Sequence, residues 1–235
     1  MSQLFKKEIE KGLTAISDRI GFKKKKYNFF KPINDNVFAT LGFGMATHTE
    51  KGHIYVNVTI GVSHKNVEEL RTKLTGYNSL EIMQPTIGRQ IGYLMPENSF
   101  KEWDFAENMD NSHAYEDILK NIQTYGFAYH ESMKDFDSLF EAIYQRVPGV
   151  LNQGRDRYLP IFYYLKGEKQ KGLEAIEDAI ERQKQPISEA EKERLKKLAG
   201  LGGQVIIGSG YGNVDPEYLK FVDKYITLWT KHSKP

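Results

Sequence analysis

The segment His53-Ile54-Tyr55-Val56-Asn57-Val58-Thr59-Ile60-Gly61-Val62 alternates apolar side chains with more polar ones along its length. A period of two places successive side chains on opposite faces, so this segment predicts a β-strand with one buried and one more polar face. Residues 37–45 are also rich in β-branched and aromatic side chains, and the polar residues 47–52 connect the two segments. Together they predict neighbouring antiparallel strands.

An amphipathic helix is predicted before these strands. Its apolar side chains recur at helical spacing, which places them on one face: they are Phe5, Ile9, Leu13, Ile16 and Ile20. Gly21 suits the position just after the helix, because glycine readily adopts the left-handed conformation that ends many helices. Residues 22–30 predict a further strand, and residues 100–105 predict a last one.

Helical periodicity dominates from residue 111 onward. The predicted helices cover residues 112–122, 136–147, 158–165, 173–180, 188–199 and 216–229, and an earlier short helix is capped by Ser63 and runs to residue 74. The fold class is therefore predicted as α+β: an N-terminal helix packed on an antiparallel sheet of about 4–5 strands, followed by a helical C-terminal part. Residues 1–147 form the predicted α+β domain, and residues 148–235 form a helical region that is either separate or packed into the same domain.

The amino-acid composition and net charge exclude several classes of protein. The chain of 235 residues has no cysteine and a formal net charge of +2, which excludes disulfides and cysteine-ligated metals and gives no overall reason to expect nucleic acid. Its apolar runs are too short for a membrane helix. Charges at Lys6, Lys7, Glu8 and Glu10 interrupt the N-terminus, where a secretory signal would be apolar. The expectation is a soluble, cytoplasmic protein with no membrane partner.

The motifs that would bring catalytic chemistry are incomplete. Gly208-Ser209-Gly210-Tyr211-Gly212 lacks the spacing of a dinucleotide-binding loop and the lysine of a P-loop, so we interpret it as a connector. His48 and Glu50 have the spacing of a zinc deaminase motif, but the cysteines of that motif are missing. No catalytic, metal-binding or cofactor-binding residue is therefore predicted. The sequence favours a non-enzymatic protein and leaves an enzyme open.

Charge is unevenly distributed along the chain. Residues 97–141 carry three basic and eleven acidic side chains, a net charge of −8, whereas residues 1–31 have a net charge of +6. The acidic part supplies the predicted partner-binding residues, which are Glu97, Glu102, Trp103, Asp104, Glu107, Asp110, Glu116 and Asp117. An acidic surface with an aromatic anchor suits docking of a basic protein. The alternative is a solvated rim around a Trp103 that lies in the core.

A second charged segment, Lys23 to Lys26, is flanked by aromatic side chains. Such a mixture is typical of proteins that bind single-stranded nucleic acid. In a strand, however, Lys24 and Lys26 would share one face and Lys23 and Lys25 the other, so no more than half of these lysines could form one row. Lysines also prevent sheets from pairing edge to edge, and this structural interpretation of an edge strand is the one we favour.

The leading helix, Gly21-Phe22-Lys23-Lys24 and the strand Tyr55-Val56-Asn57-Val58-Thr59-Ile60-Gly61 resemble an uncharacterised bacterial domain family. The resemblance covers about residues 4–145 and includes Trp103 in a late strand that precedes helices. It implies a helix on an antiparallel sheet and carries no catalytic residues. Similar domains occur among proposed immunity proteins of bacterial toxin systems, which implies binding rather than turnover.

Three functions follow from these observations. The leading prediction is a non-enzymatic immunity protein that neutralises a bacterial toxin, such as a nuclease, through the acidic and aromatic residues 97–117. The alternative is an enzyme or small-molecule binder with a pocket between the sheet and the C-terminal helices, since 14 Tyr and 13 Phe are available to line one. The third is binding of nucleic acid through the N-terminal lysines.

Overall fold

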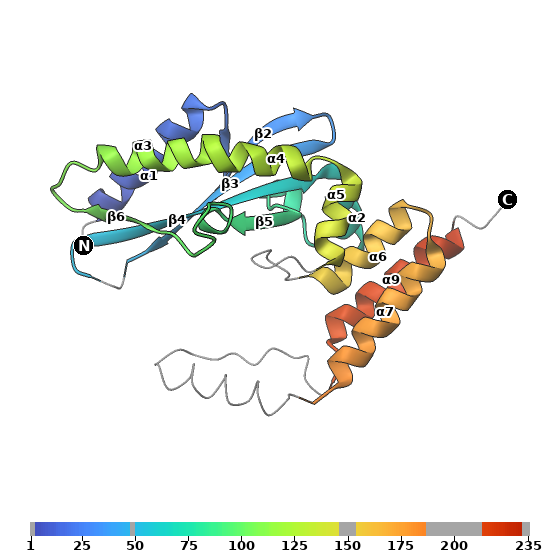
Figure 1. Cartoon of the computed structure of the whole chain (residues 1–235). Coiled ribbons are helices and arrows are strands. Elements are labelled where there is room, and N and C mark those ends of the chain that lie inside the picture. The colour runs from blue at the N-terminus through green and yellow to red at the C-terminus, as the bar shows by residue number, and fades with distance from the viewer. Residues whose placement is uncertain (1–2, 48–49, 146–153, 187–212, 232–235) are drawn as a thin grey trace. The chain divides into compact units, whose positions relative to one another are not determined.

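The structure is a computed structural model that describes residues 3–47, 50–145, 154–186 and 213–231 (Figure 1). The chain divides into two compact units, one formed by residues 1–72 and 77–153 and the other by residues 73–76 and 154–235. The helix predicted over residues 188–199 and the glycine-containing residues 208–212 lie outside the described residues.

The described part of the first unit combines helices with a six-stranded antiparallel sheet, which confirms the predicted α+β class. The helices are α1 (Gln3–Arg19), α2 (Lys65–Thr75, of which residues 65–72 belong to this unit), α3 (Ser112–Asn121), α4 (Phe127–Met133) and α5 (Phe136–Tyr144). The strands are β1 (Lys23–Lys25), β2 (Asn28–Asn34), β3 (Val37–Ala46), β4 (His53–His64), β5 (Ile87–Gln90) and β6 (Trp103–Ala106). A π-helical turn, Ile122–Gly126, joins α3 to α4.

The long strand β4 organises the sheet. The strand order is β1-β2-β3-β4-β5, and β6 also pairs with β4. Residues 59–62 of β4 pair with β5, whereas residues 53–56 pair with β6. One side of β4 therefore carries two short strands end to end, and β6 is an edge strand.

The predicted alternation along β4 is confirmed. Its apolar side chains have an exposed fraction of 0%, and they are Ile54, Val56, Val58, Ile60 and Val62. The intervening Tyr55, Asn57 and Thr59 are partly exposed. Figure 1 shows α1, α3 and α4 over one face of the sheet. The hydrophobic core of the first unit lies between these helices and that face, where each fully buried aliphatic side chain contributes about 1.5–3 kcal/mol.

Two glycines fix how α1 is placed. Gly21 has a φ of +83° just after the helix, as its position in the sequence predicted. Gly12 lies on the side of α1 that faces α3, and a Cβ atom there would be 2.3 Å from the ring of Tyr115. The absence of a side chain at Gly12 therefore allows α1 and α3 to approach closely.

Residues 22–30 do not form one strand, so that prediction is wrong. They contain β1 and the start of β2, with Lys26 and Tyr27 as the turn between them. Lys26 has a φ of +53°, which a residue other than glycine rarely adopts. The edge position predicted for the lysines is confirmed, because β1 lies at one end of the sheet. Ser63 does not cap α2, since β4 continues through His64.

The described helices of the second unit are α6 (Arg155–Leu165), α7 (Lys169–Lys184) and α9 (Pro216–Lys231). Aromatic side chains of α9 form much of its core, including the buried Tyr218, Phe221 and Tyr225. Gly172 leaves room for one of them, because a Cβ atom at this position would lie 2.0 Å from the Tyr225 hydroxyl. Among the described helices, none has the length and hydropathy needed to cross a membrane.

Candidate functional site

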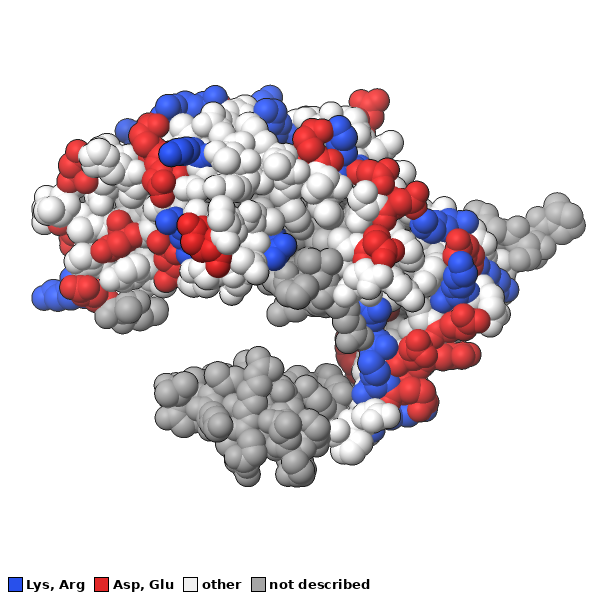
Figure 2. Space-filling model, viewed as in Figure 1, with Lys and Arg blue, Asp and Glu red and all other residues white. Residues whose placement is uncertain are grey.

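The acidic segment, which we define as residues 97–117, covers the loop before β6, β6 itself and the first turns of α3. Most of its carboxylates are exposed: Glu97, Glu102, Asp104, Asp110 and Glu116, while Glu107 and Asp117 are partly buried. Figure 2 shows acidic side chains interspersed with basic ones on the face in view, rather than one continuous acidic area. The contacts of each carboxylate therefore decide what the segment can bind.

Trp103 is not a surface anchor, so this residue of the predicted partner-binding set needs correction. Its exposed fraction is only 6% because it pairs with Val56 of β4 and packs into the core. Its Nε1–H donates a hydrogen bond of 2.7 Å to Asp117 Oδ2, and the Nζ of Lys101 lies 5.1 Å from the centre of its ring. The exposed aromatic residue of the segment is instead Phe100, with an exposed fraction of 54%.

Several predicted carboxylates have partners within the chain. Glu116 forms an ion pair of 2.6 Å with Arg19 of α1. Asp110 accepts hydrogen bonds from the backbone N–H and the hydroxyl of Ser112, at 2.9 and 3.0 Å, and these bonds hold the pKa of Asp110 below its usual value. Glu116 and Asp110 therefore stabilise the start of α3. A partner that docked on these two carboxylates would have to compete with their contacts within the chain.

A second group of carboxylates, Glu50, Glu102 and Asp104, lies where β4 pairs with β6. The Nδ1 of His53 lies 2.8 Å from Asp104 Oδ1, and its Nε2 lies 3.7 Å from Glu50 Oε1. The hydrogen bond with Asp104 raises the pKa of His53. Burial also raises the pKa of Tyr55, and the charges of Asp104, Glu50 and Glu102 raise it further. The outer surface of this strand pair is therefore negative.

The pair formed by His53 and Asp104 gives a direct test of this electrostatic description. Replacing Asp104 with asparagine should lower the pKa of His53 toward its ordinary value of 6.5, because the imidazolium loses the partner that stabilises it most. An NMR titration of the histidine ring protons measures this shift. Asp110→Asn, which removes an acidic side chain that makes no contact with His53, should leave the titration unchanged. An unaltered titration in Asp104→Asn would contradict the assigned contact.

A surface hollow of about 290 Å³ lies in the same segment. Its lining residues are Gly92, Met95, Glu97, Ser99, Phe100, Lys101 and Glu102. The loop around it closes tightly at Gly92, whose carbonyl accepts a hydrogen bond of 3.2 Å from the Ser99 N–H. A Cβ atom at Gly92 would lie 2.2 Å from the Ser99 carbonyl oxygen, so only glycine allows this closure.

The hollow is lined by both negatively charged and aromatic side chains. Glu97 and Glu102 supply two negative charges, and Phe100 supplies an exposed aromatic ring. Lys101 also lines the hollow, but its Nζ lies 3.8 Å from Asp117 Oδ2. A guanidinium or ammonium group fits such surroundings, because carboxylates pair with it and an aromatic face attracts it. The sequence identified both glutamates, but it did not single out Phe100 or the hollow.

Within the described ranges, no three His, Asp or Glu side chains lie close enough together to hold a metal ion. His48 of the deaminase-like spacing lies outside the described residues, and His130 is buried against Phe22 and Phe127.

A protein-family model described as a domain of unknown function (DUF4304) matches residues 18–137, just over half of the chain. The matched residues begin near the end of α1 and extend to the start of α5, so they include the whole sheet and the acidic segment. Comparisons with curated proteins and with solved structures found no match. The predicted resemblance to an uncharacterised domain family is confirmed, whereas its connection with toxin immunity stays a prediction.

Proposed function

This chain belongs to the DUF4304 family of domains of unknown function, and from this starting point we propose that it is a non-enzymatic protein that docks a basic protein partner. The acidic segment forms the docking surface. Its core contact is an arginine or lysine side chain of the partner, seated in the hollow beside Phe100.

The observation that carries this proposal is the composition of the hollow itself. Two glutamates and an exposed phenylalanine line a space of about 290 Å³, which is large enough for one long basic side chain. The carboxylates near Tyr55 extend the negative surface along β4 and β6. Such a surface increases the rate at which a basic partner associates, and the enclosed side chain provides the desolvated contact.

The finer form of the proposal is an immunity protein that blocks a toxin. A nuclease is a suitable partner class, because an enzyme that binds nucleic acid presents a basic surface. A carboxylate-rich protein placed over that surface would exclude the nucleic acid. The proposal places the chain in the cytoplasm, where proteins generally lack disulfides, in agreement with a sequence that has no cysteine.

Charge reversal in the hollow should strongly weaken partner binding. We expect Glu97→Lys combined with Glu102→Lys to weaken binding at least tenfold, because the partner's cation would meet two ammonium groups instead of two carboxylates. Affinity purification from native cells with the wild-type chain and this variant identifies proteins whose recovery depends on the hollow. The affinity of the purified pair is then measured over a range of salt concentrations.

The matched control carries the same change in net charge on α7. Glu177→Lys combined with Asp178→Lys alters two exposed acidic residues of the second unit and should keep wild-type affinity. A basic partner that binds the wild type and the control, but not the hollow variant, supports the proposal. Equal binding by all three chains, or a purified partner with an acidic contact surface, would refute it.

A further inference from the structure

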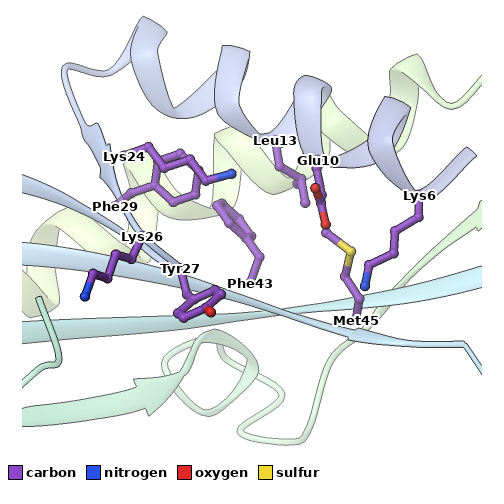
Figure 3. A pocket seen from close by; sticks show the side chains of 9 residues that line it. All are labelled: Lys6, Glu10, Leu13, Lys24, Lys26, Tyr27, Phe29, Phe43 and Met45. Carbon is purple, nitrogen blue, oxygen red and sulfur yellow. The ribbon is translucent and has the colours of Figure 1, made fainter. Parts of the chain in front are cut away.

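A second, larger pocket lies in the first unit between α1 and the hairpin of β1 and β2. Its volume is about 400 Å³, and residues from α1, the hairpin and β3 line it. Figure 3 shows Lys6 and Glu10 extending from α1 toward Met45, while Lys24 extends over Phe29 from the opposite side. The sequence predicted a pocket between the sheet and the C-terminal helices, whereas this one is formed entirely within the N-terminal 45 residues.

The charged side chains of this pocket are suited to an anion. Three lysines line it, and one of them, Lys26, already forms an ion pair with Glu81. Within the described part of the chain, neither Lys6 nor Lys24 forms an ion pair with a carboxylate. The Nζ of Lys24 lies 5.8 Å from the centre of the Phe29 ring, and Lys6 and Lys24 come from separate elements. Two ammonium groups without a carboxylate partner in the described part therefore line one space, which favours a ligand with a phosphate or carboxylate group.

The uncharged walls of the pocket are suited to a flat ring. Phe29 and Phe43 pack edge to face, with their ring centres 5.4 Å apart, and form an apolar wall. Tyr27, at the tip of the hairpin, has an exposed fraction of 84%. An aromatic side chain so poorly buried gains contact area if a ligand stacks on it. Figure 3 shows the ring of Phe43 beside the end of the Lys24 side chain, so a base against Phe43 and an anionic group at the lysines can be accommodated together.

Glu10 further limits the chemical class of ligand that fits this pocket. It lines the pocket on the same side as Lys6, one turn farther along α1. A carboxylate accepts hydrogen bonds, so the ligand needs a hydroxyl or amino group as well as an anion. A nucleoside phosphate carries all three parts: a phosphate, ribose hydroxyls and an aromatic base.

We propose that this pocket binds a nucleoside monophosphate, with the phosphate between Lys6 and Lys24 and the base against Phe43 and Tyr27. The ribose hydroxyls donate to Glu10. A volume of about 400 Å³ accommodates one such nucleotide. The site is separate from the acidic segment and does not depend on the docking function proposed above.

Titration of the full chain with AMP tests this site, using calorimetry for the affinity and NMR to locate the contact. We expect shifts at residues 24–29 and 43–45, and at least tenfold weaker binding of adenosine or of inorganic phosphate alone. Lys6→Ala combined with Lys24→Ala should weaken AMP binding at least tenfold, because both phosphate contacts are lost. Tyr27→Ala should weaken it severalfold.

The control is Lys7→Ala combined with Lys11→Ala, which removes two exposed lysines of α1 that do not line the pocket. It should bind AMP like the wild type, and thermal melting confirms that each variant is folded. No AMP binding at millimolar concentration, or unchanged binding by the Lys6 and Lys24 variant, would overturn the proposal. A short oligoadenylate that binds tenfold more tightly than AMP would also overturn it, in favour of a nucleic-acid strand.

Discussion

Replacing Glu68 with alanine should lower the free energy of unfolding of the first unit by about 3–5 kcal/mol, the usual cost of removing one partner of a buried ion pair. Glu68 lies on α2, and its exposed fraction is 0%. Its carboxylate accepts hydrogen bonds from Thr86 Oγ1 at 2.8 Å, from Arg71 at 3.1 Å and from the Ser79 hydroxyl. The substitution leaves these buried or partly buried donors without their common acceptor, and it releases residues 79–86 from α2.

The first unit can be followed on its own, because the two tryptophans lie in different units. In a Trp229→Phe background, fluorescence during urea unfolding reports only on Trp103. Glu69→Ala is the matched control: Glu69 is the exposed neighbour of Glu68, and its contact with Lys65 is 3.9 Å long, so its loss should cost less than about 1 kcal/mol. If Glu68→Ala were no more costly than this control, the network would not stabilise the fold.

The fold was predictable where periodicity is local. The alternation along β4 and the helical spacing in α1 both depend on neighbouring residues, and both predictions are confirmed. The hairpin of β1 and β2 was missed because its turn contains Lys26 and Tyr27 rather than a glycine or asparagine. A lysine with a positive φ has no sequence pattern that predicts it. The edge position of β1 was predictable from its lysines.

The candidate site was less predictable, because its contacts join distant residues. Asp104 meets His53 across 51 positions, and Glu116 meets Arg19 across 97 positions. Sequence reasoning grouped the acidic residues by proximity along the chain and could not show which of them pair internally. It also could not decide between a surface and a core position for Trp103, since that depends on how β6 pairs with β4. The density of acidic residues over residues 97–117 was the one pattern that pointed to this part of the surface.

His130 should make the stability of the first unit depend strongly on pH. Its exposed fraction is 4%, and burial lowers its pKa to about 4, from an ordinary value of 6.5. Its ring lies against Phe22 and Phe127, and its Nε2 lies 3.4 Å from the Thr40 carbonyl oxygen. The nearby charges are opposed, because Lys31 lowers the pKa and Glu131 raises it, so burial decides the direction.

The sign of this effect follows from which state binds the proton more tightly. The unfolded chain protonates His130 near pH 6.5, whereas the folded chain resists protonation until about pH 4. The contribution of His130 to the free energy of unfolding is therefore complete above pH 6.5 and is lost as the pH falls toward 4, a loss of about 3 kcal/mol over this interval.

The variant His130→Gln tests this effect, because glutamine keeps a hydrogen-bond donor but does not titrate. Between pH 6.5 and pH 4, the free energy of unfolding of the variant should fall by about 3 kcal/mol less than that of the wild type. The pKa values of Asp110 and Asp135 are also lowered, so protonation of these carboxylates in acid also reduces the stability of the fold. This reduction is the same in both chains and cancels in the comparison. Urea unfolding followed through Trp103 at several pH values measures the difference. Parallel pH profiles for the two chains would mean that His130 is already solvated in the folded state.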